Sequence, residues 1–243
     1  NIPNYKNIIP KYKDLYFDPK NEYSVPYNVG MVGLVYNTKM VEGTPDSWSI
    51  MWDEKYKGQV LMFNNSRDAF GIAQFLLGID VNTTSEQDWK KAYQKLKEQK
   101  PVVQSYVMDD VFNKMEGGEA AIAAYYAGDC IGMAENNPDL AFVYPKEGTN
   151  IFVDSICIPK GCQNKDAAEL YINFLLRGDI ALANAECLCY ATPNQAVLDN
   201  EDNLKIEGND VMSVYIGLIT FAVIVVVYFI YRTIRKKKRE SMY

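Results

Sequence analysis

The stretch QVLMFNNSRDAF, residues 59–70, decides the fold class, because it leads directly from a strand pattern into the start of a helix. Gln59–Phe63 is a short apolar run of the length that buried strands have. In the polar residues that follow, Asn65 or Ser66 can cap a helix, and Asp68 can complement the helix dipole. A strand that passes straight into a helix predicts an α/β layered fold. In such folds ligands bind at the carboxyl edge of the sheet, where we expect this junction to lie.

The same alternation of strand and helix patterns continues on both sides of this stretch. Ser85, followed three residues later by Asp88, resembles a capping box, and apolar residues recur at helical spacing up to Leu96. Residues 166–177, DAAELYINFLLR, predict a second helix, which Gly178 is expected to cap. The apolar face of this second helix consists of Ala167, Leu170, Tyr171 and Phe174. Further strands are predicted at Met31–Tyr36, Ala121–Tyr125, Leu140–Tyr144 and Ile151–Ile158.

An acidic residue interrupts the last of these strands, IFVDSICIP, residues 151–159. An ionised carboxylate is costly to bury unless something pairs with it, so Asp154 needs a partner. Phe152 and Asp154 point to the same face of a strand, because side chains alternate with a period of two. The pattern indicates an aromatic surface beside an acid. A structural salt bridge or a turn is the alternative interpretation of Asp154.

A third candidate lies in AAYYAGD, residues 123–129, where a predicted strand ends in two tyrosines and a glycine. Tyr126 can line a cleft at the edge of the sheet, but a tyrosine is often only a half-buried packing residue. For Asp68, the alternative to a ligand contact is an ordinary helix start, with the carboxylate complementing the dipole.

The composition excludes several classes of function. The 243 residues are 48% hydrophobic, as in a globular protein, and carry a formal charge of −6. Residues 232–243 hold six Lys or Arg and one Glu, which leaves −11 on residues 1–231. This acidity argues against nucleic acid and favours a cationic ligand. The chain has no histidine, and its five cysteines lack metal-site spacing. We therefore predict no enzyme activity, no cofactor and no metal site.

The carboxyl-terminal part predicts a membrane anchor. Val211–Tyr231 is a run of 21 residues without a charge, and about 20 apolar residues cross a bilayer as a helix. Residues 232–243 form a basic tail that is expected in the cytoplasm, and residues 197–210 an acidic tether. Residues 1–210 then lie outside the cell, or in the periplasm. Such a topology needs an export signal or an earlier span, and the opening NIPNYKNIIP offers neither, so a preceding part is expected to be missing.

Five stretches together resemble the spermidine/putrescine-binding proteins of bacterial ABC importers. They are YFDPKNEYSVPYNVGMVGLVYNTK, WDEKYKGQVLMFNNSRDAF, YPKEGTNIFVDSICIP, NKDAAELYINFLLR and YATPNQA, in the order and spacing of that family over residues 15–196. The resemblance implies a two-lobed periplasmic-binding-protein-like (type II) α/β fold that holds a polyamine between its lobes. It makes residues 29–150 the second lobe and residues 1–28 and 151–196 part of an incomplete first lobe.

The resemblance also implies the ligand contacts. Asp68 and Asp154 correspond to family acids that bind amine ends, while Tyr126 and Phe152 stand where the family has tryptophans. Asn65 replaces a further family acid, so a neutral amide stands here in place of one carboxylate. This change predicts a preference for a shorter or less charged amine.

These features lead to one main functional hypothesis. We expect a membrane-anchored extracellular protein that binds polyamines, such as putrescine or spermidine, and delivers them to an ABC permease and indirectly to its ATPase. One alternative is the same fold with another small cationic or organic solute. Another is the ectodomain of a ligand sensor, although the 12 residues after the predicted span leave no room for a catalytic domain.

Overall fold

The computed structural model describes residues 1–199, which divide into two compact units. One unit is residues 31–151, and the other joins residues 1–30 to the described residues from 152 onward. The chain crosses between the units twice, once within strand β1 (Val25–Asn37) and once within strand β6 (Ile151–Ile156). These crossings lie one or two residues from the lobe boundaries that the resemblance implies.

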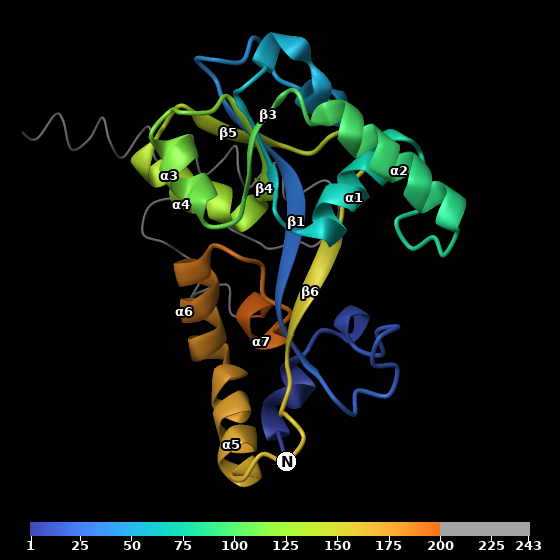
Figure 1. Cartoon of the computed structure of the whole chain (residues 1–243). Helices are drawn as coiled ribbons and strands as arrows, with labels where there is room; N and C mark the ends of the chain where they lie inside the picture. The colour runs from blue at the N-terminus through green and yellow to red at the C-terminus, as the bar shows by residue number, and fades with distance from the viewer. Residues whose placement is uncertain (200–243) are drawn as a thin grey trace, which may run out of the picture. The chain divides into compact units, whose positions relative to one another are not determined.

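The unit of residues 31–151 is built on a mixed sheet, of which Figure 1 labels β1, β3, β4 and β5. The strand order is β3-β2-β4-β1-β5. Strand β2 pairs in parallel with both β3 and β4, whereas β1 is antiparallel to β4 and β5. The carboxyl ends of the three parallel strands therefore meet at one edge. The bounds of these strands are β2 Val60–Phe63, β3 Val103–Val107, β4 Ile122–Tyr126 and β5 Leu140–Val143.

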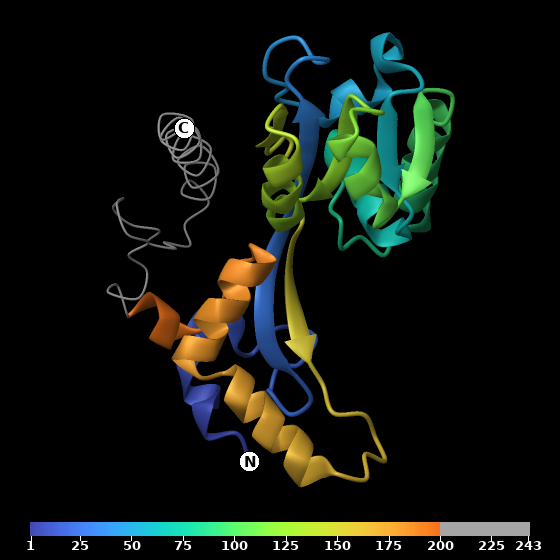
Figure 2. The same ribbon diagram turned by 90° about the vertical axis from the view of Figure 1, so that its left-hand side faces the viewer.

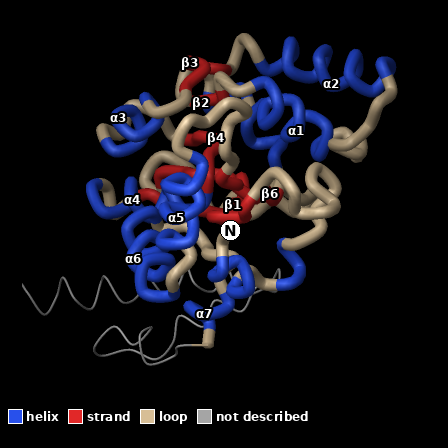
Figure 3. Tube along the Cα trace, turned by 90° about the horizontal axis from the view of Figure 1, so that it is seen from below, coloured by secondary structure: helices blue, strands red, loops and turns tan. Residues whose placement is uncertain are grey.

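Two pairs of helices cover this sheet. Helix α1 packs on α2, and α3 packs on α4, with the strands between the two pairs (Figure 3). Every residue of β2 is buried, because the strand is covered on both faces. The bounds are α1 Ser66–Leu76, α2 Glu86–Gln99, α3 Asp110–Glu116 and α4 Ala127–Asn136, with 3-10 turns η3 Trp48–Trp52 and η4 Glu54–Tyr56. The α/β layering predicted from residues 59–70 is confirmed.

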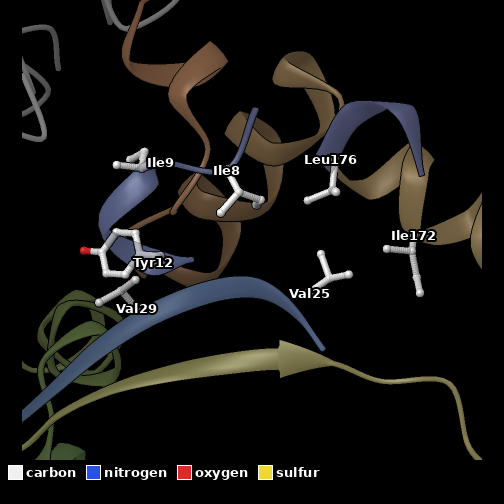
Figure 4. Close-up of a cluster of buried hydrophobic side chains, with 7 residues drawn as sticks. All are labelled: Ile8, Ile9, Tyr12, Val25, Val29, Ile172 and Leu176. Atoms are coloured by element: carbon white, nitrogen blue, oxygen red, sulfur yellow. The ribbon is translucent and has the colours of Figure 1, made fainter. Parts of the chain in front are cut away.

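The other unit pairs β6 with β1 and packs helices on one side of this strand pair (Figure 2). Its core lies between the strands, the helices and the amino-terminal turns (Figure 4). The elements are η1 Pro3–Asn7, η2 Pro10–Tyr12, α5 Lys165–Leu175, α6 Gly178–Leu188 and α7 Gln195–Leu198. The buried cluster consists of Ile8, Ile9, Tyr12, Val25, Val29, Ile172 and Leu176.

Several local predictions were wrong. Strand β1 begins at Val25 rather than Met31, and β3 was not predicted, because this strand alternates half-buried and exposed residues without an apolar run. Gly178 does not cap α5 but begins α6. The predicted apolar face of α5 is exposed, since Leu170 is 71% exposed, and the helix contacts the core through Ile172 instead.

Part of the predicted topology falls outside the described residues. The expected tether begins at Val197, but this residue is buried in α7. Residues 200–210 of the tether, the predicted span Val211–Tyr231 and the basic tail 232–243 lie outside the described part of the chain. Within residues 1–199, no helix has both the length and the apolarity needed to cross a membrane.

Candidate ligand-binding site

The end of β2 places a buried acid at the start of α1. Asn65 caps this helix, because its side chain accepts a hydrogen bond from the Arg67 N–H at 3.0 Å. Asp68 then lies in the first turn and is only 6% exposed. A buried carboxylate is costly unless hydrogen-bond donors surround it. The cost of burying Asp68 therefore depends on the hydrogen-bond donors that contact its carboxylate.

Three side chains donate hydrogen bonds to the Asp68 carboxylate. Oδ2 accepts from Asn65 Nδ2 and from the Tyr126 hydroxyl, each at 2.9 Å. Oδ1 accepts from Asn150 Nδ2 at 3.2 Å. A carboxylate has about four acceptor positions, so one is still available. All three donors are neutral, and no cation of the described residues pairs with Asp68.

Aromatic rings lie beside this carboxylate at the carboxyl ends of β2 and β4. The Tyr126 ring centroid is 5.1 Å from that of Phe63 and 4.9 Å from that of Tyr125. Burial, together with the negative charge of Asp68, raises the pKa of the Tyr126 hydroxyl. This hydroxyl therefore stays protonated and can donate to Asp68 at neutral pH. Tyr126 thus packs among aromatic rings and donates to the acid, and its contact with a ligand stays a prediction.

Strand β6 carries the second pair of predicted site residues, in the other unit. The side chain of Phe152 is half-buried, and its ring centroid lies 6.4 Å from that of Tyr190. Asp154, two residues further along the strand, is exposed. Among residues 1–199, none donates a hydrogen bond to Asp154 or forms an ion pair with it. Partial desolvation raises the pKa of this carboxyl.

The five predicted site residues thus form two groups, each within one unit. Asn65, Asp68 and Tyr126 belong to one hydrogen-bonded cluster, and Phe152 and Asp154 lie on one strand. The sequence did not indicate Asn150, which donates to Asp68, or Phe63 and Tyr125, whose rings lie beside that of Tyr126. Phe63 and Tyr125 could have been found from their positions at the ends of neighbouring parallel strands, where side chains meet at one edge of the sheet. Asn150 offered none, because 82 sequence positions separate it from Asp68.

A family model described as bacterial extracellular solute-binding protein matches residues 1–211. The chain is 35% identical over 196 residues to the spermidine/putrescine-binding periplasmic protein of Salmonella typhimurium, covering 80% of this chain and 56% of that protein. It is 29% identical over 211 residues to a putrescine/cadaverine-binding protein of Pseudomonas aeruginosa, covering 81% and 59%. The chain therefore spans little more than half the length of these curated relatives.

Solved structures of similar proteins share the fold. A spermidine/putrescine ABC transporter substrate-binding protein from Streptococcus pneumoniae has a TM-score of 0.74 and 33% identity, over 90% of this chain and 67% of that one. A putative spermidine/putrescine ABC transporter protein from Listeria monocytogenes has a TM-score of 0.77 and 30% identity, over 95% and 74%.

Proposed function

The chain belongs to the bacterial extracellular solute-binding proteins, which are binding proteins and not enzymes, and on this premise we propose that it binds a linear polyamine. The ligand class is that of putrescine and spermidine. One observation carries the proposal. It is the buried Asp68 carboxylate, whose hydrogen-bond donors among the described residues are all neutral. A buried negative charge with an acceptor position still available favours a cationic ligand.

An ammonium group suits the surroundings of Asp68. It donates a charge-assisted hydrogen bond to the carboxylate, which is worth ~1.5–3 kcal/mol. The ring of Tyr126, whose hydroxyl contacts Asp68, can add a cation–π attraction of ~0.5–2 kcal/mol. The neutral donors fix the orientation of the carboxylate before the ligand arrives. Asp68 is therefore proposed as the main ammonium acceptor of its unit.

Phe152 and Asp154 are proposed as ligand residues of the other unit. Asp154 is an exposed carboxylate without a partner among the described residues, and Phe152 offers an aromatic face on the same side of β6. This is again the combination that an alkylammonium group requires.

Asn65 limits the negative charge near Asp68. It donates to Asp68 rather than adding a second carboxylate, so this cluster holds one acid among its hydrogen-bonded members. One acid balances one ammonium group. We therefore propose that the protein prefers putrescine or spermidine to the more highly charged spermine.

Membrane anchoring and delivery to a transporter are also part of the proposal. The uncharged run of residues 211–231, followed by six Lys or Arg, supports a single-pass anchor with the binding units outside the cell or in the periplasm. The similarity to ABC transporter binding proteins supports delivery to a permease and, through it, to an ATPase. An anchor raises the effective concentration of the binding protein beside that permease.

Isothermal titration calorimetry of the full chain with putrescine, spermidine and spermine tests the proposed ligand. Asp68→Asn is expected to weaken putrescine binding ~10- to 100-fold, because a charge-assisted hydrogen bond is lost. Glu86→Gln is the matched control, since it removes the same charge from an exposed site in the same unit, and it should leave affinity unchanged. Absence of heat with all three amines, at protein concentrations of about 50 µM, rules out micromolar polyamine binding.

A further inference from the structure

A glycine of β1 lies directly beneath the ring of Phe152. A methyl group added at the Gly30 Cα would lie 2.2 Å from Phe152 Cζ and 2.6 Å from Cε2. Carbon atoms in contact are normally ~3.5–4 Å apart, so the ring occupies the space that a side chain would need. Gly30 and Phe152 belong to the same unit, and their strands pair. Any larger residue at position 30 must displace the ring.

The backbone conformation does not explain this glycine. Gly30 is not among the residues with a positive φ, so other residues could adopt its dihedral angles. Glycine in the interior of a strand weakens it and often marks a close approach of another group. The close approach here is the Phe152 ring, which has the Tyr190 ring as a further neighbour. Tyr190 is held near β1 because the Val29 N–H donates to the Ala191 carbonyl at 2.9 Å.

We propose that Gly30 is a positioning residue for ligand binding, because it sets the depth at which the Phe152 ring lies against β1. This inference rests on the proposed function, in which Phe152 offers its face to an ammonium group. Cation–π attraction needs the cation within about 6 Å of the ring centroid and over the face of the ring. A residue that lifts or tilts the ring at position 30 therefore weakens binding without touching the ligand itself.

The chain offers a matched control on the same strand. Gly33 lies beneath the ring of Phe142, and a methyl group there would be 2.2 Å from Phe142 Cζ and 2.8 Å from Cε1. Phe142 belongs to β5 and is not a proposed ligand residue. Gly33→Ala thus makes nearly the same steric demand on β1 as Gly30→Ala. The three atoms nearest to the added methyl group at Gly33 all belong to Phe142 and none to Phe152.

A double-mutant cycle on the full chain tests the inference, with putrescine as the probe. Phe152→Leu removes the aromatic face and should weaken binding ~2- to 30-fold, the range of one cation–π contact. Gly30→Ala should weaken binding within the same range, and Gly33→Ala should leave affinity unchanged. In the Gly30→Ala/Phe152→Leu variant the glycine substitution should have no further effect, because it acts only through the ring.

Each outcome has a distinct meaning. If the natural chain does not bind any polyamine, both the proposed function and the proposed role of Gly30 are overturned. If the natural chain binds and Phe152→Leu has no effect, the role of Phe152 and of Gly30 is overturned while polyamine binding stands. If Phe152→Leu weakens binding but Gly30→Ala matches the natural chain, or adds its full effect in the double variant, only the role of Gly30 is overturned.

Folding of the variants and the position of the ring are read independently of affinity. Circular dichroism checks that each variant folds. If Gly30→Ala does not fold, the affinities of Phe152→Leu and of the double variant are compared instead, and they should be equal. The Gly30 Hα resonances should be shifted by the ring current of Phe152 and should move toward ordinary values in Phe152→Leu. Unchanged Gly30 resonances in that variant would show that the ring does not lie over the glycine in solution.

Discussion

Asp154 differs from Asp68 in its surroundings, because it is exposed and receives no hydrogen bond from the described residues. Desolvation alone raises its pKa, which means that the folded protein holds this proton more tightly than the unfolded chain. The contribution of Asp154 to folding stability is therefore lost as the pH rises from the ordinary aspartate value through the raised one. A cationic ligand offsets the cost of ionising Asp154, because it pairs with the ionised carboxylate.

This difference predicts a pH dependence of ligand binding. Putrescine affinity should fall toward acid pH, starting above the ordinary aspartate pKa, because protonated Asp154 cannot pair with an ammonium group. Calorimetric titrations from pH 7.5 downward, toward the ordinary aspartate pKa, measure the effect. Asp154→Asn should weaken binding at pH 7.5 and remove this part of the pH dependence. An identical pH profile in the natural chain and the variant would assign the acid effect to another group.

The sequence predicted site residues where the signal was local. Asp68 follows a strand and a cap within a few positions, and Asp154 interrupts an apolar strand. Asn150 donates to Asp68 from a distant part of the chain, and no spacing rule connects the two. The position of the Phe152 ring over Gly30 was equally unpredictable, because a glycine in a strand does not show which side chain fills the space above it.

At the scale of one element, α5 shows why an apolar face does not by itself identify the core side of a helix. Leu170, Tyr171 and Phe174 are exposed, whereas Ile172 and Leu176 pack into the buried cluster. The helix has apolar residues on two sides, so periodicity gives the positions of both faces but not which one is covered. The tertiary contacts of η1, η2 and β1 decide this, and they come from distant segments of the chain (Figure 4).

A pair of truncations on α5 measures this difference. Ile172→Ala should lower the free energy of unfolding by ~2–5 kcal/mol, because it removes buried methyl groups from a packed cluster. Leu170→Ala, on the exposed side, should change it by less than about 0.5 kcal/mol. Urea unfolding of the two variants and the natural chain gives both values. Equal losses would mean that the Leu170 face is covered in solution.

At the scale of the whole molecule, the order of strand and helix patterns along the chain predicted the layered fold correctly. The pairing of strands was not predictable in the same way. Strand β1 pairs with β4, β5 and β6, which lie far from it in the sequence, and its first six residues carry no apolar run that marks them as strand. The half-buried edge strand β3 was missed for the same reason. Local propensity identifies buried strands, while long-range pairing defines where edge and crossing strands begin.

Net charge acts on the molecule as a whole and predicts how salt affects binding. The chain carries a formal charge of −6, so polyamines approach an attractive field that ions screen over about 30 Å at 0.01 M salt and about 10 Å at 0.1 M. Affinity should therefore fall as NaCl is raised across this range, and more steeply for spermidine than for putrescine because spermidine carries one more charge. Calorimetry at several salt concentrations measures the two slopes.

Asp68→Asn should flatten both slopes, since one of the interacting charges is lost, and Glu86→Gln tests whether a remote surface charge does the same. Affinities that do not change with salt would contradict recognition by charge and would favour a neutral solute as the ligand of this protein.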